Sequence, residues 1–326
     1  MLVHLARLGL AASQDAPVTT VEALAAIDRF GVHELVDNAD HADVILFTQC
    51  HLLPNDWRLT SIRDHPLAKR HRDKVMVYDE RDRPWCGFPG VYVSMPARAF
   101  DHDHQRAFAY FPPARTDFQE APDLLFSFIG SPSARCRKPL FALKHADAIV
   151  EEVRRFTFFD HGSSNFEQQR ARFQNVLGRS RFVLCPRGRG TSSIRLFETL
   201  AAGRVPVIVA DDWVAPTYAD WDSFSIRWPE RETNGLVQEL EERSDNWPAM
   251  SAAATTAYRD FFAPNVWFHR LVELCDDLKQ SDVQGFPSAG VRNRAFLAAG
   301  ADFRRWRATS AARRTGRRAL RGLGLG

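Results

Sequence analysis

Apolar residues in the first third of the chain follow two alternating patterns. Residues 21–30 have helical spacing, with Thr19 or Thr20 available as the N-cap. Residues 43–48 and 74–78 are short, nearly continuous apolar runs that end at polar residues. Runs of this kind are typical of parallel strands covered on both faces. The pattern therefore predicts βαβ units in this part of the chain.

The alternation starts again after residues 111–122, which carry three prolines and no periodicity. We interpret them as a linker between two lobes. After the linker the pattern predicts strands at residues 124–129, 181–185, 205–209 and 224–227, and helices at residues 138–155, 193–202, 234–242 and 266–279. The predicted domains are an N-terminal α/β lobe (1–118), a C-terminal α/β lobe (119–290) and a basic C-terminal tail (291–326).

The composition is that of an ordinary globular protein, with 45% apolar and 25% charged residues in a chain of 326. It excludes a collagen-like or wholly disordered chain, and no apolar stretch approaches the roughly 20 residues of a membrane-spanning helix. The first 14 residues lack the apolar core of a signal peptide, so we expect a cytoplasmic protein. The five cysteines form no CxxC pair, which argues against a disulfide framework and a zinc knuckle.

The net charge of +3 averages two unlike parts of the chain. Residues 303–326 hold eight arginines and no acidic residue, which leaves the rest of the chain at about −5. Phe303 and Trp306 give this tail the character of an anchor for anionic lipid, and a disordered basic tail is the equal alternative. No nucleic-acid partner is expected, because the body contains no recognisable nucleic-acid-binding module.

Residues 182–213 carry the chemical signal, as a strand, a glycine-bearing loop, a helix, a glycine and a second strand. Gly188 and Gly190 allow a tight turn or a close approach to a ligand. The helix start has three hydroxyl residues and, around them, three arginines: Thr191, Ser192, Ser193, Arg187, Arg189 and Arg195. A helix N-terminus at the C-terminal ends of parallel strands favours an anion, so we expect a phosphate or diphosphate site. The alternative is a structural loop with solvated arginines.

Glu198 lies one helical turn after Arg195. Its carboxylate could accept hydrogen bonds from the vicinal hydroxyls of a ribose, and an internal Arg–Glu pair is the alternative. The loop has neither the GxxxxGK[ST] spacing of an ATPase nor the GxGxxG spacing of an NAD site.

The same residues resemble the donor-binding signature of the exostosin family, glycosyltransferase family 47. The matching positions are Pro186-Arg187-Gly188, Ser193, Arg195, Glu198, Gly203, Val205-Pro206-Val207, Trp213 and Pro216. Upstream, residues 126–131 with Arg135 resemble the strand–Gly–Ser–Arg element of the family. Arg204 departs from the cysteine that often follows the glycine, and we expect a surface substitution there.

The resemblance implies a GT-B fold, with two Rossmann-like lobes and a donor cleft between them. It also implies inverting transfer from a nucleotide sugar, usually a UDP-sugar, to a glycan or glycolipid acceptor. The donor-binding candidates are Arg135, Arg187, Gly188, Ser193, Arg195, Glu198 and Asp212. Asp211 and Asp212 could contact the donor sugar or form an Asx turn.

Inverting transfer needs a general base from the opposite lobe. Asp79 and Glu80 directly follow a predicted strand and are the candidates, with a solvated turn as the alternative, and His51 at the end of the neighbouring run is another possible base. Two DxD tripeptides occur, at Asp101 and Asp220, which is the number that 26 aspartates in 326 residues produce by chance. We therefore predict no metal site and no cofactor beyond the nucleotide-sugar co-substrate.

Three tryptophans, Trp57, Trp85 and Trp213, could stack on a sugar or on uracil, with core packing as the alternative. The sequence as a whole predicts an inverting glycosyltransferase of surface-polysaccharide or lipopolysaccharide assembly, peripheral on the inner face of a membrane. The alternative is a catalytically silent exostosin-like component of an assembly complex that binds glycan or nucleotide.

Overall fold

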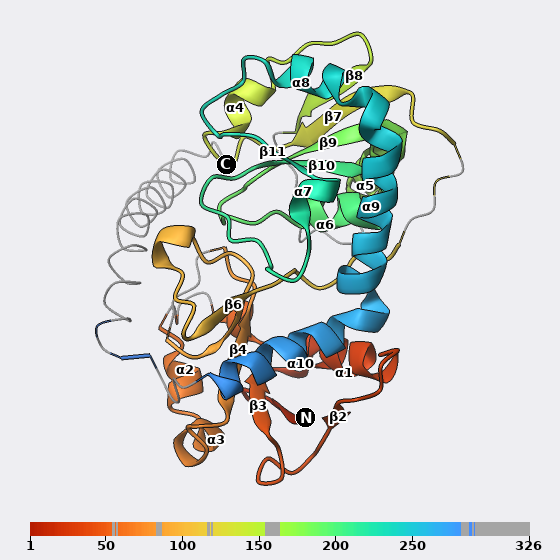
Figure 1. The fold of residues 1–326 in the computed structure, drawn as a ribbon. Helices are drawn as coiled ribbons and strands as arrows, with labels where there is room; N and C mark the ends of the chain where they lie inside the picture. The colour runs from red at the N-terminus through yellow and green to blue at the C-terminus, as the bar shows by residue number, and fades with distance from the viewer. Residues whose placement is uncertain are drawn as a thin grey trace.

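The chain forms two parallel β-sheets, each with its own helices (Figure 1). The structure is a computed structural model that describes residues 1–53, 56, 58–82, 87–115, 118, 120–153, 164–281, 287, 288 and 290. The basic tail beyond residue 303, Trp57 and Trp85 lie outside the described residues.

The N-terminal sheet has six parallel strands in the order β2-β1-β3-β4-β5-β6. Its strands are β1 (Leu2–Ala6), β2 (Glu34–Leu35), β3 (Val44–Phe47), β4 (Val75–Asp79), β5 (Gly90–Tyr92) and β6 (Gln105–Ala107). The helices of this part are α1 (Ala16–Ala26), α2 (Thr60–Arg63) and α3 (Pro66–Arg70), with short 3-10 turns η1 (Ala12–Gln14), η2 (Cys50–Leu52) and η3 (Ala97–Ala99). Every residue of β3 and β4 is buried, as their continuous apolar runs predict.

The C-terminal sheet has five parallel strands in the order β11-β10-β9-β7-β8. Its strands are β7 (Leu124–Gly130), β8 (Ala148–Glu152), β9 (Ser180–Pro186), β10 (Val205–Val209) and β11 (Ile226–Arg227). Its helices are α4 (Arg137–Leu140), α5 (Ser164–Arg179), α6 (Ile194–Ala201), α7 (Trp221–Phe224), α8 (Leu236–Glu242) and α9 (Trp247–Ala257), with a 3-10 turn η4 (Ser244–Asn246). The two Rossmann-like sheets confirm the α/β GT-B architecture.

The chain returns to the first lobe through a π-helical turn η5 (Tyr258–Phe262) and the long helix α10 (Pro264–Gln280). In Figure 1 this helix, drawn in blue, lies across the N-terminal sheet beside α1. Trp267 of α10 is fully buried, and its indole Nε1–H donates to the Tyr110 carbonyl at 3.0 Å. The sequence-based boundaries assign α10 to the C-terminal lobe, whereas the helix packs on the N-terminal one.

One hydrophobic core runs through both lobes. It contains Val3 and Tyr78 of the first sheet, Trp267 of α10, and Val183 and Leu196 of the second lobe. Among the residues that the structure describes, no helix combines the length and the apolar character that a membrane span requires.

Two sequence-based helix predictions were wrong in detail. α1 begins at Ala16 with Pro17 in its first turn, so the hydroxyls of Thr19 and Thr20 bond back to the Ala16 carbonyl instead of capping the helix. The helix predicted over residues 138–155 is the short α4 followed by the strand β8. The β-branched pair Ile149-Val150 suits the pleated edge of the sheet.

Arg204 is not a surface substitution, because only 8% of the residue is exposed. Its guanidinium donates from Nε (3.1 Å) and Nη2 (2.6 Å) to the Gly178 carbonyl in the last turn of α5. The group also lies over the rings of Phe118 and Trp247, at 5.5 and 5.9 Å from their centroids. Arg204 therefore ties the end of α5 to the helical side of the lobe, where a cation near a helix C-terminus is favourable.

Candidate functional site

The candidate site lies at the C-terminal ends of β7, β9 and β10. The Arg187 backbone N–H donates to the Val209 carbonyl at 3.1 Å, so the loop leaves both strands together. Ser193 is the N-cap residue of α6, with an extended φ of −139°, and its side chain makes no capping bond. Gly203 follows the helix with a φ of +63°, the left-handed conformation predicted for a C-terminal glycine.

Gly190 is needed for a close approach of the two lobes. A Cβ at this position would lie 2.8 Å from Oγ of Ser94 and 3.0 Å from the Cα and carbonyl oxygen of Asp82. At Gly188 the nearest atom would be Nη2 of Arg137, at 3.4 Å. Neither glycine has a positive φ, so the reason for Gly190 is the crowding against the N-terminal lobe and not a tight turn.

Arg195 supplies a guanidinium that the protein only partly satisfies. Its Nη2 donates to the Ile129 carbonyl at the end of β7, and the group lies 5.1 Å from the ring centroid of Phe128. Nε and Nη1 are buried and have no hydrogen-bond partner among the described residues. Burial lowers the pKa of Arg195, but the group remains charged because an arginine pKa starts so high.

Three further polar atoms of the same segment are buried without a partner among the residues described. They are Oγ1 of Thr191, Oγ of Ser192 and Nε1 of Trp213. Leaving such a donor unsatisfied costs about 1–3 kcal/mol. Thr191 and Ser192 belong to the loop that leads into α6 and Arg195, and unsatisfied donors in such a loop are the pattern expected of a site that binds an anion.

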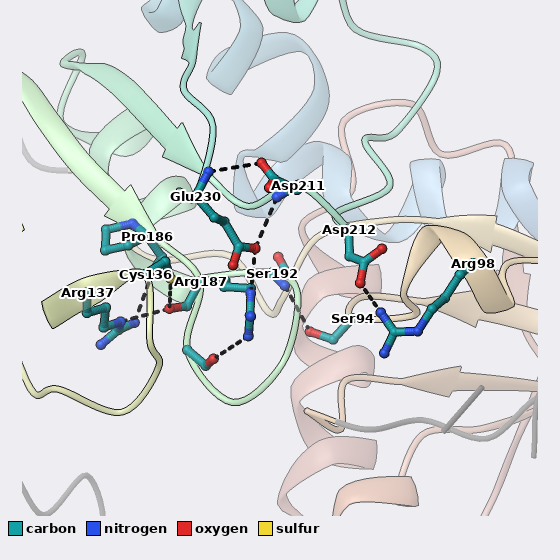
Figure 2. A network of polar contacts seen from close by, with 11 residues as sticks. Ser94, Arg98, Cys136, Arg137, Pro186, Arg187, Ser192, Asp211, Asp212 and Glu230 are labelled. Carbon is teal, nitrogen blue, oxygen red and sulfur yellow. Dashed lines mark hydrogen bonds and ion pairs between the residues drawn. The ribbon is translucent and has the colours of Figure 1, made fainter. Parts of the chain in front are cut away.

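Arg137 is a site residue that the sequence reasoning missed. Its Nε donates to the Arg187 carbonyl at 2.8 Å and its Nη2 to the Pro186 carbonyl at 3.0 Å, as Figure 2 shows. Burial, followed by the nearby positive charge of Arg195, lowers the pKa of Arg137 to about 10. Arg135, the predicted contact, is exposed and its side chain makes no hydrogen bond or ion pair within the described part of the chain. Arg137 lies two residues after Arg135 in the sequence, on the buried side of the same segment.

Arg187 belongs to a network at the ends of β9, β10 and β11 (Figure 2). Its Nε donates to Oε1 of Glu230 at 2.6 Å, and the Asp211 N–H donates to the same oxygen at 3.1 Å. The Asp211 carboxylate in turn accepts from the Glu230 N–H at 3.1 Å. This network holds the Arg187 side chain in place. It also gives Asp211 a structural role, as in the Asx turn that was the alternative to a sugar contact.

Glu198 lies on α6 one turn from Arg195. Among the described contacts no hydrogen bond or ion pair joins the Glu198 and Arg195 side chains. An internal Arg–Glu pair therefore does not explain why a glutamate stands at position 198. Burial raises the pKa of Glu198, while the charges of Arg195 and Arg170 oppose that rise. The carboxylate thus keeps its capacity to accept hydrogen bonds from a ligand.

Asp212 lies in the seam between the lobes. Its carboxylate forms an ion pair with Arg98, drawn in Figure 2, and its carbonyl accepts from the Ala97 N–H at 2.8 Å. The next residue, Trp213, forms a β-bridge with Pro96. Asp212, predicted as a donor contact, therefore joins the C-terminal lobe to the N-terminal lobe.

The seam also connects the donor loop with the end of β4. The Ser192 N–H donates to Oγ of Ser94 at 3.4 Å, and that oxygen lies 3.0 Å from the Tyr110 hydroxyl. Asp82 packs against Gly190 of the donor loop. The carboxylates after β4 consequently lie across the seam from the anion site.

The two candidate bases differ sharply in their environment. Asp79 is fully buried, and both of its oxygens accept from Arg81, at 2.6–3.0 Å. A carboxylate held in this way is not available to an acceptor hydroxyl. The Glu80 side chain is 17% exposed, and its Oε1 lies 3.1 Å from Nδ1 of His51. Burial and then the charge of Asp79 raise the pKa of Glu80 to about 7, against the lowering effect of the Tyr78 hydroxyl.

Metal-binding clusters are absent from the described part of the chain, where no group of three or more His, Cys, Asp or Glu side chains could hold an ion. In the Asp101–His104 segment, Nδ1 of His104 lies 2.9 Å from the Asp101 carboxylate, which makes a local pair.

Comparison with known proteins identifies this architecture. A family model, the exostosin GT47 domain, matches residues 39–242, more than half of the chain. The chain is 38% identical over 82 residues to an exostosin-1 homolog of Caenorhabditis elegans, an alignment that covers 24% of this chain and 22% of the relative. It is 40% identical over 85 residues to a probable glucuronoxylan glucuronosyltransferase of Arabidopsis thaliana, covering 24% of this chain and 19% of that protein.

A solved glycosyltransferase structure from Rickettsia africae aligns over 86% of this chain and 99% of its own, with 11% identity and a TM-score of 0.45. The curated relatives are matched over about a fifth of their own length. The family domain, in contrast, runs from β3 to α8 and so covers strands β3 to β6 of the first sheet and the whole second sheet. The chain belongs to the exostosin family, glycosyltransferase family 47.

Proposed function

We propose that the protein is an inverting glycosyltransferase that moves a sugar from a UDP-sugar to a glycan or glycolipid acceptor in surface-polysaccharide synthesis. The observation that carries this proposal is the buried guanidinium of Arg195, whose Nε and Nη1 have no partner among the described residues and lie in the segment matched by the family. A diphosphate supplies the acceptors that these donors lack.

On the donor side, the reaction breaks the bond between the anomeric carbon and the diphosphate. Negative charge then develops on the leaving oxygen, and fixed cations stabilise it best when little reorganisation is needed. Arg195 meets this condition because contacts with Ile129 and Phe128 already fix it. Arg137 holds the loop carbonyls, and Glu198 is proposed to accept hydrogen bonds from the ribose hydroxyls.

On the acceptor side, Glu80 is proposed as the general base. It takes the proton of the acceptor hydroxyl while that oxygen attacks the anomeric carbon opposite the diphosphate, which inverts the configuration. Its pKa of about 7 suits this task, since the carboxylate is substantially ionised at neutral pH and still basic.

We also propose that catalysis is independent of a divalent metal. The guanidinium groups of Arg137 and Arg195 both donate to backbone carbonyls at or just after the end of β7, those of Ser131 and Ile129, whereas the guanidinium of Arg187 is paired with Glu230. Arg137 and Arg195 supply the positive charge that Mg²⁺ or Mn²⁺ provides in other phosphate-transfer sites.

A thermal-shift panel of UDP, GDP, CMP and TDP and their sugars tests the proposal. We expect UDP to raise the melting temperature, by an amount that corresponds to about 2.7 kcal/mol at a hundredfold excess over the dissociation constant. Glu198→Ala is expected to reduce this shift. No shift with any nucleotide would overturn the proposal. UDP binding without turnover of any UDP-sugar would identify the silent exostosin-like component instead.

The basic tail, residues 303–326, is proposed to hold the enzyme on an anionic cytoplasmic membrane surface. Sedimentation with vesicles of phosphatidylglycerol and phosphatidylcholine compares the full chain with a chain that ends at Asp302. Loss of sedimentation on truncation supports the anchor, and equal sedimentation of the two chains contradicts it.

A further inference from the structure

Ser94 and Tyr110 form a buried pair of hydroxyl groups at the C-terminal edge of the N-terminal sheet. Ser94 lies two residues after β5, and Tyr110 lies three residues after the neighbouring parallel strand β6. Oγ of Ser94 lies 3.0 Å from the Tyr110 hydroxyl, so the two groups are hydrogen-bonded. Ser94 is fully buried and Tyr110 is nearly so. The two side chains meet because their strands end side by side.

The donor loop of the C-terminal lobe, residues 187–193, lies directly on this pair. The Ser192 N–H donates to Oγ of Ser94 at 3.4 Å, a contact across the seam that Figure 2 shows. On the other side of Thr191, a Cβ at Gly190 would lie 2.8 Å from the same oxygen. Residues 190 and 192 are thus both packed against one hydroxyl group of the opposite lobe.

The Tyr110 side chain is held in place by contacts that do not involve its hydroxyl. Its backbone carbonyl accepts from Nε1–H of Trp267 at 3.0 Å. Its ring meets the ring of Phe197, on α6, edge to face, with the centroids 6.2 Å apart. Removing the hydroxyl therefore leaves the backbone and the ring of Tyr110 in place and takes away only the support behind Ser94.

The position of the loop matters for the donor because the loop leads directly into α6. Ser193, the next residue after Ser192, is the N-cap of this helix. Arg195 stands in the first turn, with Nε and Nη1 buried and without a partner among the described residues. Fixing the backbone at residue 192 therefore fixes where the first turn begins and where the Arg195 side chain leaves it.

We propose that Ser94 is a positioning residue for the nucleotide-sugar donor: its hydroxyl, supported by Tyr110, holds residues 190–192 so that the first turn of α6 presents Arg195 to the diphosphate. This inference rests on the proposed function, in which Arg195 binds the diphosphate. Ser94 acts through the loop, and no bond or proton changes at its side chain. A loop that is ordered in advance loses less conformational freedom on binding, so Ser94 acts on the dissociation constant and KM and leaves kcat unchanged.

Two substitutions remove the hydroxyl groups one at a time. Ser94→Ala takes away the acceptor of the Ser192 N–H, and Tyr110→Phe takes away only the hydroxyl behind it. The measurements are calorimetric titration with UDP and the rate of UDP release from UDP-glucose, UDP-N-acetylglucosamine and UDP-glucuronic acid. In Ser94→Ala the UDP dissociation constant and the donor KM should both rise about fivefold, with kcat within about twofold of wild type, because one neutral hydrogen bond is lost. In Tyr110→Phe both constants should rise about threefold.

The variant that combines both substitutions gives the sharpest result. Two hydroxyls that act independently would together weaken UDP binding about fifteenfold, whereas a Tyr110 hydroxyl that acts through Ser94 adds nothing once Ser94 is alanine. We expect the double variant to bind UDP about as weakly as Ser94→Ala alone. Tyr258→Phe is the matched control, because this buried tyrosine donates from its hydroxyl to the Pro113 carbonyl, at 2.5 Å, in the same crossing segment. The control should melt at a lower temperature and keep the wild-type UDP affinity.

Unchanged or tighter UDP binding in Ser94→Ala would overturn the inference, because the loop would then not depend on Ser94. A fully additive loss in the double variant, or an equal loss of affinity in Tyr258→Phe, would also overturn it. The wild-type chain tests the proposed function separately. If it binds UDP and all variants bind UDP equally well, only the role of Ser94 is wrong. If it binds no nucleotide, the proposed function and the role of Ser94 are both wrong.

Discussion

If the proposed donor site is correct, two partly or fully buried arginines, Arg195 and Arg204, should respond differently to the same substitution: one should lose UDP affinity and the other stability. Both carry their guanidinium over two aromatic rings and donate to a backbone carbonyl. Arg195 leaves two donor nitrogens, Nε and Nη1, unsatisfied, and Arg204 has no such atom among the described residues. Substitution by methionine keeps an unbranched apolar side chain at each position and removes the hydrogen-bond donors of the guanidinium.

The magnitudes follow from these contacts. At Arg195 each of the two unsatisfied nitrogens costs about 2 kcal/mol, and the Ile129 hydrogen bond with the two ring contacts contributes a similar total in the opposite direction. Arg195→Met should therefore change the free energy of unfolding by no more than about 1 kcal/mol. At Arg204 no such cost offsets the bonds to Gly178, so Arg204→Met should lose about 3 kcal/mol.

Melting temperature and UDP affinity together provide the assay. We expect Arg204→Met to melt about 6–10 °C lower with an unchanged UDP dissociation constant at 10 °C, and Arg195→Met to melt within about 3 °C of wild type. Loss of two charge-assisted hydrogen bonds should weaken UDP binding by Arg195→Met at least about 100-fold. A strong drop in melting temperature for Arg195→Met with unchanged UDP affinity would refute the assignment of its free N–H groups to the donor.

Three further outcomes are expected. Activity should rise with pH through about 7 as Glu80 ionises. Because the pKa of Glu80 is raised in the folded state, the stability that this group contributes is present at low pH and is lost as the pH rises through 7. Denaturant titrations should therefore find that Glu80→Gln stabilises the fold at pH 8 and not at pH 4. Gly190→Ala should lower kcat/KM more than tenfold and reduce the melting temperature, because its Cβ would meet backbone atoms of Asp82 at 3.0 Å. Gly188→Ala should stay near wild type, because its Cβ would lie at ordinary contact distances, 3.4 Å from Nη2 of Arg137 and 3.8 Å from Oγ of Ser133. Equal effects of the two substitutions would contradict the close lobe contact. Turnover should persist in excess EDTA, and abolished turnover that Mn²⁺ restores would contradict metal independence.

The strands that surround the proposed donor site could be predicted because their signals are local. β9 and β10 are continuous apolar runs, and Gly203 ends α6 as its position suggests. The boundary between α4 and β8 could not, because a short helix and an edge strand share an ambiguous apolar pattern. The sheet partner of β8, not its own propensity, decides its conformation.

The site residues divide in the same way. The candidates Arg195 and Glu198 follow from their spacing at a helix start, whereas the place of Arg137 depends on its bonds to carbonyls 49 and 50 residues away. The burial of Arg204 and the ion pair between Asp79 and Arg81 also depend on the packing of the folded chain. A sequence lists the charged groups, and only the packing tells which of them are already paired.

The packing of α10 has the same origin. The apolar stripe of α10 is clear in the sequence. Which lobe the helix packs against depends on Trp267 and its hydrogen bond to Tyr110, 157 residues away. An amphipathic helix carries no information on which of two apolar surfaces it covers.

The most direct test of the account is to follow a UDP-sugar by time-resolved proton NMR in the presence of the full chain. We expect UDP release at neutral pH, with the transferred or hydrolysed sugar appearing first in the configuration opposite to that of the donor. The Glu80→Gln variant should release no UDP while it still binds the nucleotide. First appearance of product with retained configuration, or no UDP from any sugar nucleotide, would contradict it.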